Sequence, residues 1–254
     1  MANKTQTQAV IEIMEKRGGY TTLLDLYTEV PRVKDVKWET KTPDASIRRI
    51  VQDSKLFFKI KPGLWALNSY KAKLPSDIRI LIDDGKLNEK RDFSLHSYHQ
   101  GLLLDTGNFL GFKTYVPSQD KNQKYLDKHL QDIASLTLLP TFTYEIILQR
   151  IKSIDVVWLE GEAPTLFPKK VFEIENSTDF IKSLNKFYEL RNFTTSMVIV
   201  APNTKKKLFS ETISWGIYKS LRNRVEFWDY DRLERYYQNS IKISESSIIN
   251  LVQS

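Results

Sequence analysis

The chain has 254 residues, of which 41% are hydrophobic and 12% aromatic, enough to pack one large domain or two smaller ones. It has no cysteine, which excludes a disulfide scaffold, a thiolate zinc finger, an iron–sulfur cluster and a cysteine nucleophile, and three histidines are too few to suggest a histidine-built zinc site. The net charge is +7, and residues 1–75 hold most of it, with 14 Lys and Arg against 8 Asp and Glu. This asymmetry is typical of a polyanion-binding module joined to a nearly neutral one, and a generic Lys-rich solvated surface is the alternative.

The N-terminal residues bear on where the protein acts. Residues 1–6 are polar and lack the apolar core of a signal peptide, and no run approaches the roughly 20 apolar residues that span a bilayer. We therefore expect a soluble, cytoplasmic protein without a membrane partner.

Three helices are predicted in the first third of the chain. Apolar residues at helical spacing indicate a helix over 5–16, and a second, short helix begins near Thr21 and stops before Pro31. A third helix opens with Thr42 as N-cap and Pro43 at the first helical position.

A hairpin follows these helices. The apolar runs 57–61 and 64–67 flank a Pro-Gly turn, which predicts two antiparallel strands. Three helices and a terminal hairpin form a winged helix-turn-helix over residues 1–75. The ending, Pro62-Gly63-Leu64-Trp65-Ala66-Leu67, resembles the final strand of such domains in bacterial restriction and chromatin-associated proteins.

The third helix is the candidate recognition helix. Its apolar positions leave four polar residues on the outer side, and two lysines lie on the wing, so double-stranded DNA is the expected partner. The candidate DNA-binding residues are Ser46, Arg48, Arg49, Gln52, Lys59 and Lys61. The alternative is a module that binds another protein, because winged helices do both.

Residues 76–95 are expected to connect this module to a second domain over residues 96–254. In the second domain the pattern predicts helices over 95–110, 144–152 and 204–221, another around 180–189, and strands over 112–117, 154–159, 171–175, 196–201 and 225–228. The alternation late in the chain predicts a mixed α/β sheet with parallel crossovers. The overall fold class is thus α/β (α+β).

Three acidic residues lie on two of the predicted strands. Side chains alternate along a strand, so Glu173 and Glu175 point to the same side, and Asp155 lies on the neighbouring strand. Carboxylates that face one another repel and resist desolvation, and a divalent cation is the usual remedy. These three oxygen ligands predict a Mg²⁺ site, at which Mn²⁺ could substitute. The alternative is a wet face of the sheet with solvated carboxylates.

The order of these elements, with these acids, resembles the PD-(D/E)xK nuclease superfamily over roughly residues 95–230. Ile154-Asp155 matches the metal-binding Asp, and Glu173-Ile174-Glu175 matches the (D/E)-x-K tripeptide with Glu in the Lys position. The continuation Asn176-Ser177-Thr178, ahead of Lys182 and Leu184, is similar to a stretch of restriction-type nucleases. The opening, which begins at His99-Gln100 and ends at Tyr115-Val116-Pro117, is similar to the first helix and strand of that group.

The resemblance implies roles for particular residues. Asp155, Glu173 and Glu175 would be catalytic and hold Mg²⁺, and Lys182 is the candidate for the cation that the tripeptide lacks. His99 or Gln100 could supply an auxiliary ligand, and Glu145 is a further acidic candidate. For Lys182 and His99 the alternatives are an ordinary exposed lysine and a packed or surface histidine.

We therefore expect a Mg²⁺-dependent DNA endonuclease, either a Type II or a modification-dependent restriction enzyme. The alternative is a non-catalytic DNA-binding regulator with a vestigial nuclease-like domain. A homodimer is among the assemblies that the sequence leaves open.

Overall fold

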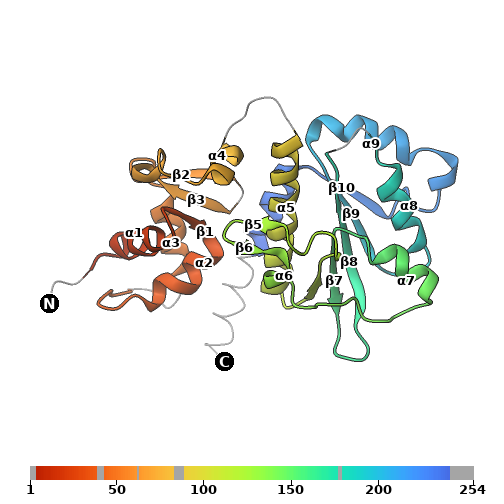
Figure 1. The fold of residues 1–254 in the computed structure, drawn as a ribbon, viewed down its shortest axis with the longest axis horizontal. Coiled ribbons are helices and arrows are strands. Elements are labelled where there is room, and N and C mark those ends of the chain that lie inside the picture. The colour runs from red at the N-terminus through yellow and green to blue at the C-terminus, as the bar shows by residue number, and fades with distance from the viewer. Residues whose placement is uncertain (1–3, 39–42, 62, 83–88, 177–178, 241–254) are drawn as a thin grey trace. The chain divides into compact units, whose positions relative to one another are not determined.

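The computed structural model describes residues 4–38, 43–61, 63–82, 89–176 and 179–240, although not the side chains of 89–93 (Figure 1). The chain forms two compact units, one made of Met1–Lys86 with Tyr237–Ser254 and the other of Leu87–Tyr236.

The described residues of the N-terminal unit form four short α-helices, two short 3-10 helices and a three-stranded antiparallel sheet in the order β1-β3-β2. Its elements are α1 (Gln6–Lys16), β1 (Tyr20–Thr22), α2 (Leu23–Glu29), η1 (Val30–Arg32), α3 (Asp44–Val51), β2 (Phe57–Lys61), β3 (Leu64–Leu67), η2 (Asn68–Tyr70) and α4 (Ser76–Ile82). This arrangement confirms the predicted winged helix.

Local sequence explains where these helices begin. Thr5 accepts a hydrogen bond from the Gln8 amide and completes a capping box at the start of α1. At the start of α2, the Thr22 side chain accepts a hydrogen bond from the Asp25 amide. The inner face of α1 is apolar at helical spacing and fully packed, with Ala9, Val10, Ile13 and Met14 buried.

Two details of this unit differ from the prediction. Pro43 is the N-cap of α3 rather than its first helical residue, and the predicted cap Thr42 lies outside the described residues. Strand β1 was not predicted, because three residues carry little local pattern and its pairing partner β3 lies more than forty positions away in the sequence.

The second unit is built on a five-stranded mixed sheet in the order β10-β9-β8-β7-β4. Strands β8, β9 and β10 run parallel, and β7 is antiparallel to both β8 and β4, which confirms the predicted sheet with parallel crossovers. The strands are β4 (Lys113–Tyr115), β7 (Val156–Glu160), β8 (Phe167–Ile174), β9 (Ser196–Val200) and β10 (Val225–Trp228).

Helices cover both faces of this sheet (Figure 1). α7 (Glu145–Ile151), α8 (Ile181–Glu189) and α9 (Lys206–Ile213) bury their apolar residues against one face. α5 (Glu89–Phe109) covers the other face, where the Trp158 indole N–H donates to the Leu103 carbonyl at 3.0 Å. Residues 230–240 are also helical.

Helix α5 approaches its neighbours closely because two of its residues lack a side chain. A Cβ at Gly101 would lie 2.1 Å from the Tyr125 ring, and one at Gly107 would lie 2.6 Å from Trp158 Nε1. Neither distance leaves room for a methyl group, so both glycines set the position of α5.

Some predicted boundaries in the second unit were wrong. α5 begins at Glu89 rather than 95, and the polar stretch 121–135 contains the short elements β5 (Lys124–Tyr125), β6 (Lys128–His129) and α6 (Leu130–Ile133). The predicted helix 204–221 is broken into η3 (Asn203–Lys205), α9 and η4 (Gly216–Tyr218). Trp215 is extended, and Tyr218 turns inward, where its hydroxyl donates to Asn185, so tertiary packing overrides helix propensity here.

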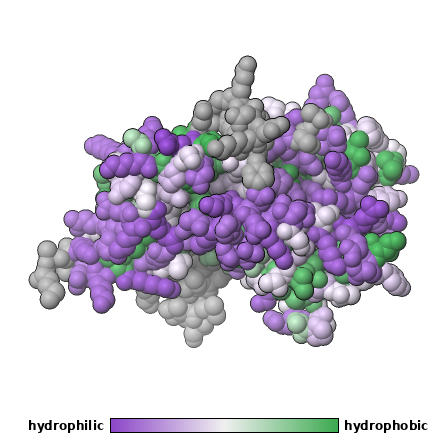
Figure 2. Space-filling view, in the orientation of Figure 1, coloured by the Kyte–Doolittle hydropathy of each residue, from purple (hydrophilic) through white to green (hydrophobic). Residues whose placement is uncertain are grey.

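Hydrophilic side chains predominate on the face seen in Figure 2, and hydrophobic ones form separate small groups. Within the described part of the chain, no helix combines the length and the apolar character needed to cross a membrane.

Candidate active site

Asp155 lies directly before strand β7 and is buried. Its Oδ2 accepts a hydrogen bond of 2.8 Å from the Ile174 amide, which belongs to the neighbouring strand β8. The strand pairing therefore fixes the carboxylate at one end of the sheet, next to Glu173.

Glu173 is also buried and is held by a lysine. Lys186 of α8 donates to both carboxylate oxygens at 2.9 Å and to the Ser153 carbonyl at 2.7 Å. The Asp155 amide donates to Glu173 Oε1 at 3.3 Å. The buried acid and the half-buried lysine thus form a charge-assisted contact that ties α8 to the ends of β7 and β8.

Glu175 follows strand β8 and shares a hydroxyl with Glu173. Ser183 Oγ lies 3.1 Å from Glu173 Oε2 and also hydrogen-bonds Glu175 Oε1. Both glutamates therefore reach the same side chain of α8, as the strand alternation predicted.

Two residues of other elements approach Asp155 from the α5 side. The Asp155 Oδ2 atom lies 3.6 Å from His96 Nε2 of α5, and donor atoms of His96, Asp120 and Asp155 all lie within 4.8 Å of one another. Two donors that bind one cation at about 2.1 Å lie at most about 4.2 Å apart, so small side-chain movements would bring all three onto a single cation.

Gln100 supports this group from one helical turn further along α5. Its Nε2 donates to Asp120 Oδ2 at 2.8 Å and to the Asp155 carbonyl at 3.2 Å. Its Oε1 is buried and accepts no hydrogen bond from any described residue. A buried acceptor of this kind fits a metal ion or a metal-bound water, so these residues suit a divalent cation.

Two buried acids of the cluster, Asp155 and Glu173, resist ionisation. Burial raises the pKa of Asp155, although His96 and Lys186 act in the opposite direction. Burial, and after it the Asp155 charge, raises the pKa of Glu173 well above its usual range. Burial alone would lower the pKa of Lys186, but Glu173 and Asp155 outweigh it and raise the pKa. One lysine thus faces several carboxylates, and an additional cation would relieve their repulsion.

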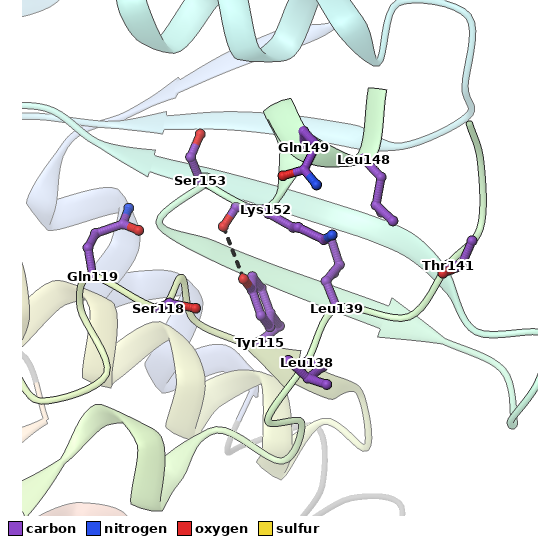
Figure 3. A pocket seen from close by; sticks show the side chains of 10 residues that line it. All are labelled: Tyr115, Ser118, Gln119, Leu138, Leu139, Thr141, Leu148, Gln149, Lys152 and Ser153. Carbon is purple, nitrogen blue, oxygen red and sulfur yellow. Dashed lines mark hydrogen bonds between the residues drawn. The ribbon is translucent and has the colours of Figure 1, made fainter. Parts of the chain in front are cut away.

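An open groove of about 570 Å³ lies beside strand β4 and helix α7 (Figure 3). Tyr115 lies at its centre and donates a hydrogen bond of 3.0 Å to the Lys152 carbonyl. Ser153, whose carbonyl accepts from Lys186, also lines the groove. Polar Gln119 and Gln149 line it together with Leu139, so its wall combines polar and apolar side chains.

The candidate DNA-binding residues of the N-terminal unit differ in exposure. Arg49, Gln52 and Lys59 are exposed, and Ser46 and Lys61 are half-buried. Arg48 is half-buried, and its Nε donates to the Tyr27 hydroxyl of α2 at 3.2 Å. Arg49 is therefore the arginine of α3 whose side chain is exposed and available to contact a ligand.

Comparison with known proteins finds a matching family model for each unit. The model of the family described as Type II restriction enzyme NmeDI C-terminal domain matches residues 79–252, well over half of the chain.

The chain belongs to this family.

Residues 4–70 match a second family model, HARE-HTH, whose description includes the restriction endonuclease HTH domain. The Type II restriction enzyme NmeDI of Neisseria meningitidis serogroup C is 28% identical to this chain over 160 residues, which cover 58% of this chain and 43% of that protein. The chain thus spans less than half the length of this curated relative. No solved structure matches this chain.

Within this NmeDI-type domain, the predicted residues divide into two groups. Asp155, Glu173 and Glu175 lie together, whereas Lys182 is exposed at the start of α8 and Glu145 is exposed on α7. His99 is buried on α5, where its ring stacks on Tyr230 at 4.0 Å, and the Tyr230 hydroxyl donates to Asn176.

Three residues of the candidate site were not predicted from the sequence, namely His96, Asp120 and Lys186. The spacing of His96 and Gln100 by four residues, and of Ser183 and Lys186 by three, places each pair on one face of a helix and could have indicated them. Asp120 lies in a loop after β4, and its sequence neighbourhood offers no such signal.

Proposed function

We propose that the protein is a divalent-metal-dependent endonuclease that hydrolyses phosphodiester bonds in double-stranded DNA, as a Type II or modification-dependent restriction enzyme. The observation that carries this proposal is the meeting of Asp155, Glu173 and Lys186 at one end of the sheet. Membership of the NmeDI C-terminal domain family and the winged helix at the other end of the chain support it.

The proposal includes membership of the PD-(D/E)xK superfamily. Asp155 would be its Asp, Glu173-Ile174-Glu175 its tripeptide, and Lys186 would supply from α8 the positive charge that the tripeptide lacks. The contact of Lys186 Nζ with both oxygens of Glu173 supports that substitution.

Each residue of the cluster would have a role in phosphodiester hydrolysis. A divalent cation, when bound, polarises the scissile phosphate and lowers the pKa of the attacking water. Asp155 would hold it, with either Glu173 and Glu175 or His96 and Asp120 as the other ligands. Lys186 would stabilise negative charge that develops on the phosphate oxygens, and the less buried Glu175 would accept the proton of the attacking water.

The winged helix would hold the DNA. Arg49, with Gln52 and Ser46 on α3, would contact base edges or phosphates, and Lys59 and Lys61 of β2 would contact the backbone. Arg48 would act more by orienting α3 against Tyr27 than by touching DNA.

Assembly and location complete the proposal. The described residues of one chain hold one such acid cluster, so cutting both strands of a duplex calls for two copies or two successive events, and a homodimer would meet this need. Cytoplasmic DNA would be the substrate.

A cleavage assay tests the proposal. Purified protein is incubated with methylated and unmethylated supercoiled plasmid, with Mg²⁺, Mn²⁺ or EDTA. We expect metal-dependent cutting of one plasmid form, its loss in Asp155→Ala and in Glu173→Ala, and DNA binding that survives in both. Glu211→Ala, which removes a largely exposed carboxylate of α9, is the matched control and should cut normally.

Undiminished cutting by either cluster variant would sink the site assignment. Binding of DNA by the wild type without cutting under any of these conditions would favour the non-catalytic regulator instead.

A further inference from the structure

The acid cluster has two sides, and they are not equally open to a cation. On the α8 side, both oxygens of Glu173 already accept from Lys186, and Ser183 Oγ reaches Glu173 and Glu175. A second positive charge there would lie beside the Lys186 ammonium and be repelled by it.

The α5 side offers a different set of donors. His96 comes from α5, Asp120 from the loop after β4, and Asp155 from the residue before β7, and their donor atoms lie within 4.8 Å of one another. Three separate elements thus converge on one point. Asp155 also links this point to the other side, because its main chain contacts Glu173.

Gln100 gives an independent indication of a ligand at that point. Its side chain is fully buried, and its Nε2 hydrogen-bonds Asp120 and the Asp155 carbonyl, yet its Oε1 accepts nothing from the described residues. Burying a carbonyl oxygen without a donor is costly. A cation, or a water bound to it, would satisfy this atom.

The chemistry of the donors selects among cations. Mg²⁺ prefers an all-oxygen octahedron, whereas an imidazole nitrogen raises the affinity for Mn²⁺, Co²⁺ and Ni²⁺. The carboxylates of Asp120 and Asp155 suit Mn²⁺ as well. We infer that His96, Asp120 and Asp155 form the metal site of this protein and that His96 makes it select Mn²⁺ over Mg²⁺.

This inference rests on the proposed function only in taking the bound cation as the nuclease cofactor. It differs from the set Asp155, Glu173 and Glu175 that the sequence suggested, and it replaces Mg²⁺ by Mn²⁺ as the preferred ion. It also gives Lys186 and the cation separate places on opposite sides of Asp155.

Calorimetry and electron spin echo spectroscopy on the full chain test it. With MnCl₂ or NiCl₂ as the titrant, the wild type should bind more tightly than with MgCl₂ by at least about tenfold. His96→Asn should lose at least about tenfold of its Mn²⁺ affinity and much less of its Mg²⁺ affinity. The echo modulation of bound Mn²⁺ should carry the nitrogen coupling of a coordinated imidazole in the wild type, and His96→Asn should lack it.

Two variants serve as controls. His129→Asn makes the same change at a histidine whose Nδ1 contacts the Asn122 carbonyl, outside the cluster, and should keep both affinity and nitrogen coupling. Asp120→Asn should weaken Mg²⁺ and Mn²⁺ alike and retain the coupling. Circular dichroism verifies that each variant is folded. If His96→Asn does not fold, the metal affinities of Asp120→Asn still test the site.

The outcomes separate this inference from the proposed function. Mn²⁺ binding that lacks nitrogen coupling in the wild type, or that is unchanged in His96→Asn, overturns the inference even if plasmid is cut. Coupling that depends on His96 supports it even if no plasmid is cut, and then the proposed nuclease activity fails alone.

Discussion

Lys186 reaches Glu173 from helix α8, whereas Lys182, the candidate from the sequence for the positive charge, lies one turn earlier and is exposed, as the alternative reading had it. The two lysines are four residues apart and share roughly one face of the helix. The sequence thus indicated the face of α8 on which the lysine lies, but not the helical turn. Which turn meets the strand depends on how α8 packs against the sheet, and no local pattern encodes that.

Replacing each lysine in turn decides between them. We expect Lys186→Met to lower the rate of plasmid cleavage by about a hundredfold or more, because it removes the ammonium that contacts Glu173 and that, in the proposed function, would stabilise charge on the scissile phosphate. Lys182→Met is the matched change on the same helix and should cut at close to the wild-type rate. A larger loss in Lys182→Met than in Lys186→Met would return the role to Lys182.

The raised pKa of Asp155 has a consequence for stability. Burial favours the protonated acid in the folded state, so its stabilising effect is present below the ordinary pKa of an aspartate and is lost as the pH rises through the higher folded value. In EDTA, the melting temperature of the wild type should therefore fall as the pH is raised above about 4, the ordinary pKa of an aspartate.

The melting temperature of Asp155→Asn should fall less over the same pH range, because a neutral amide cannot ionise. Each kcal/mol corresponds to roughly 2–4 °C in the melting temperature of a protein of this size, which a thermal scan resolves. Identical pH profiles for wild type and variant would contradict the ionisation of a buried Asp155.

At the scale of elements, agreement with the sequence followed the strength of the local pattern. Strands β9 and β10 are short apolar runs bounded by turns, and the structure has them where they were predicted. The helix over 204–221 failed because Tyr218 packs against Asn185 of another helix, a contact that periodicity cannot reveal. Helix α5 was predicted, but its rotation about its own axis was not. The sequence named His99, whereas the histidine that lies near Asp155 is His96, one turn earlier.

Helix α3 provides a matched pair of arginines for a test of DNA binding. Arg49→Ala should weaken the binding of specific duplex DNA by about 1–3 kcal/mol if the exposed guanidinium makes a bidentate base contact. Arg48→Ala should act first on the melting temperature, because it removes the hydrogen bond to Tyr27. Titrations at several salt concentrations should give a steep decrease in affinity for the wild type, since phosphate contacts release counterions. Unchanged binding by Arg49→Ala would assign α3 to a protein contact instead.

At the scale of the whole molecule, metal binding distinguishes an enzyme from a regulator with a vestigial site. A cation that binds only the folded state stabilises it by about 2.7 kcal/mol at a hundredfold excess over the dissociation constant. Millimolar Mn²⁺ or Mg²⁺ should therefore raise the melting temperature of the wild type and leave that of Asp155→Ala nearly unaffected. The same response in both proteins, together with intact plasmid, would favour the regulator.

Gly101 makes the site depend on a residue that has no functional group. It follows Gln100 directly and lies five positions after His96, and an added carbon at this position would lie 2.1 Å from the Tyr125 ring. In a library of random variants selected for the proposed DNA cleavage, position 101 should remain glycine, because even alanine would push α5 away from Asp120 and Asp155. At Gly216, where no described atom lies within 4 Å of the added carbon, many residues should survive the selection. A mutational map of activity would thus mark Gly101 as strongly as a metal ligand.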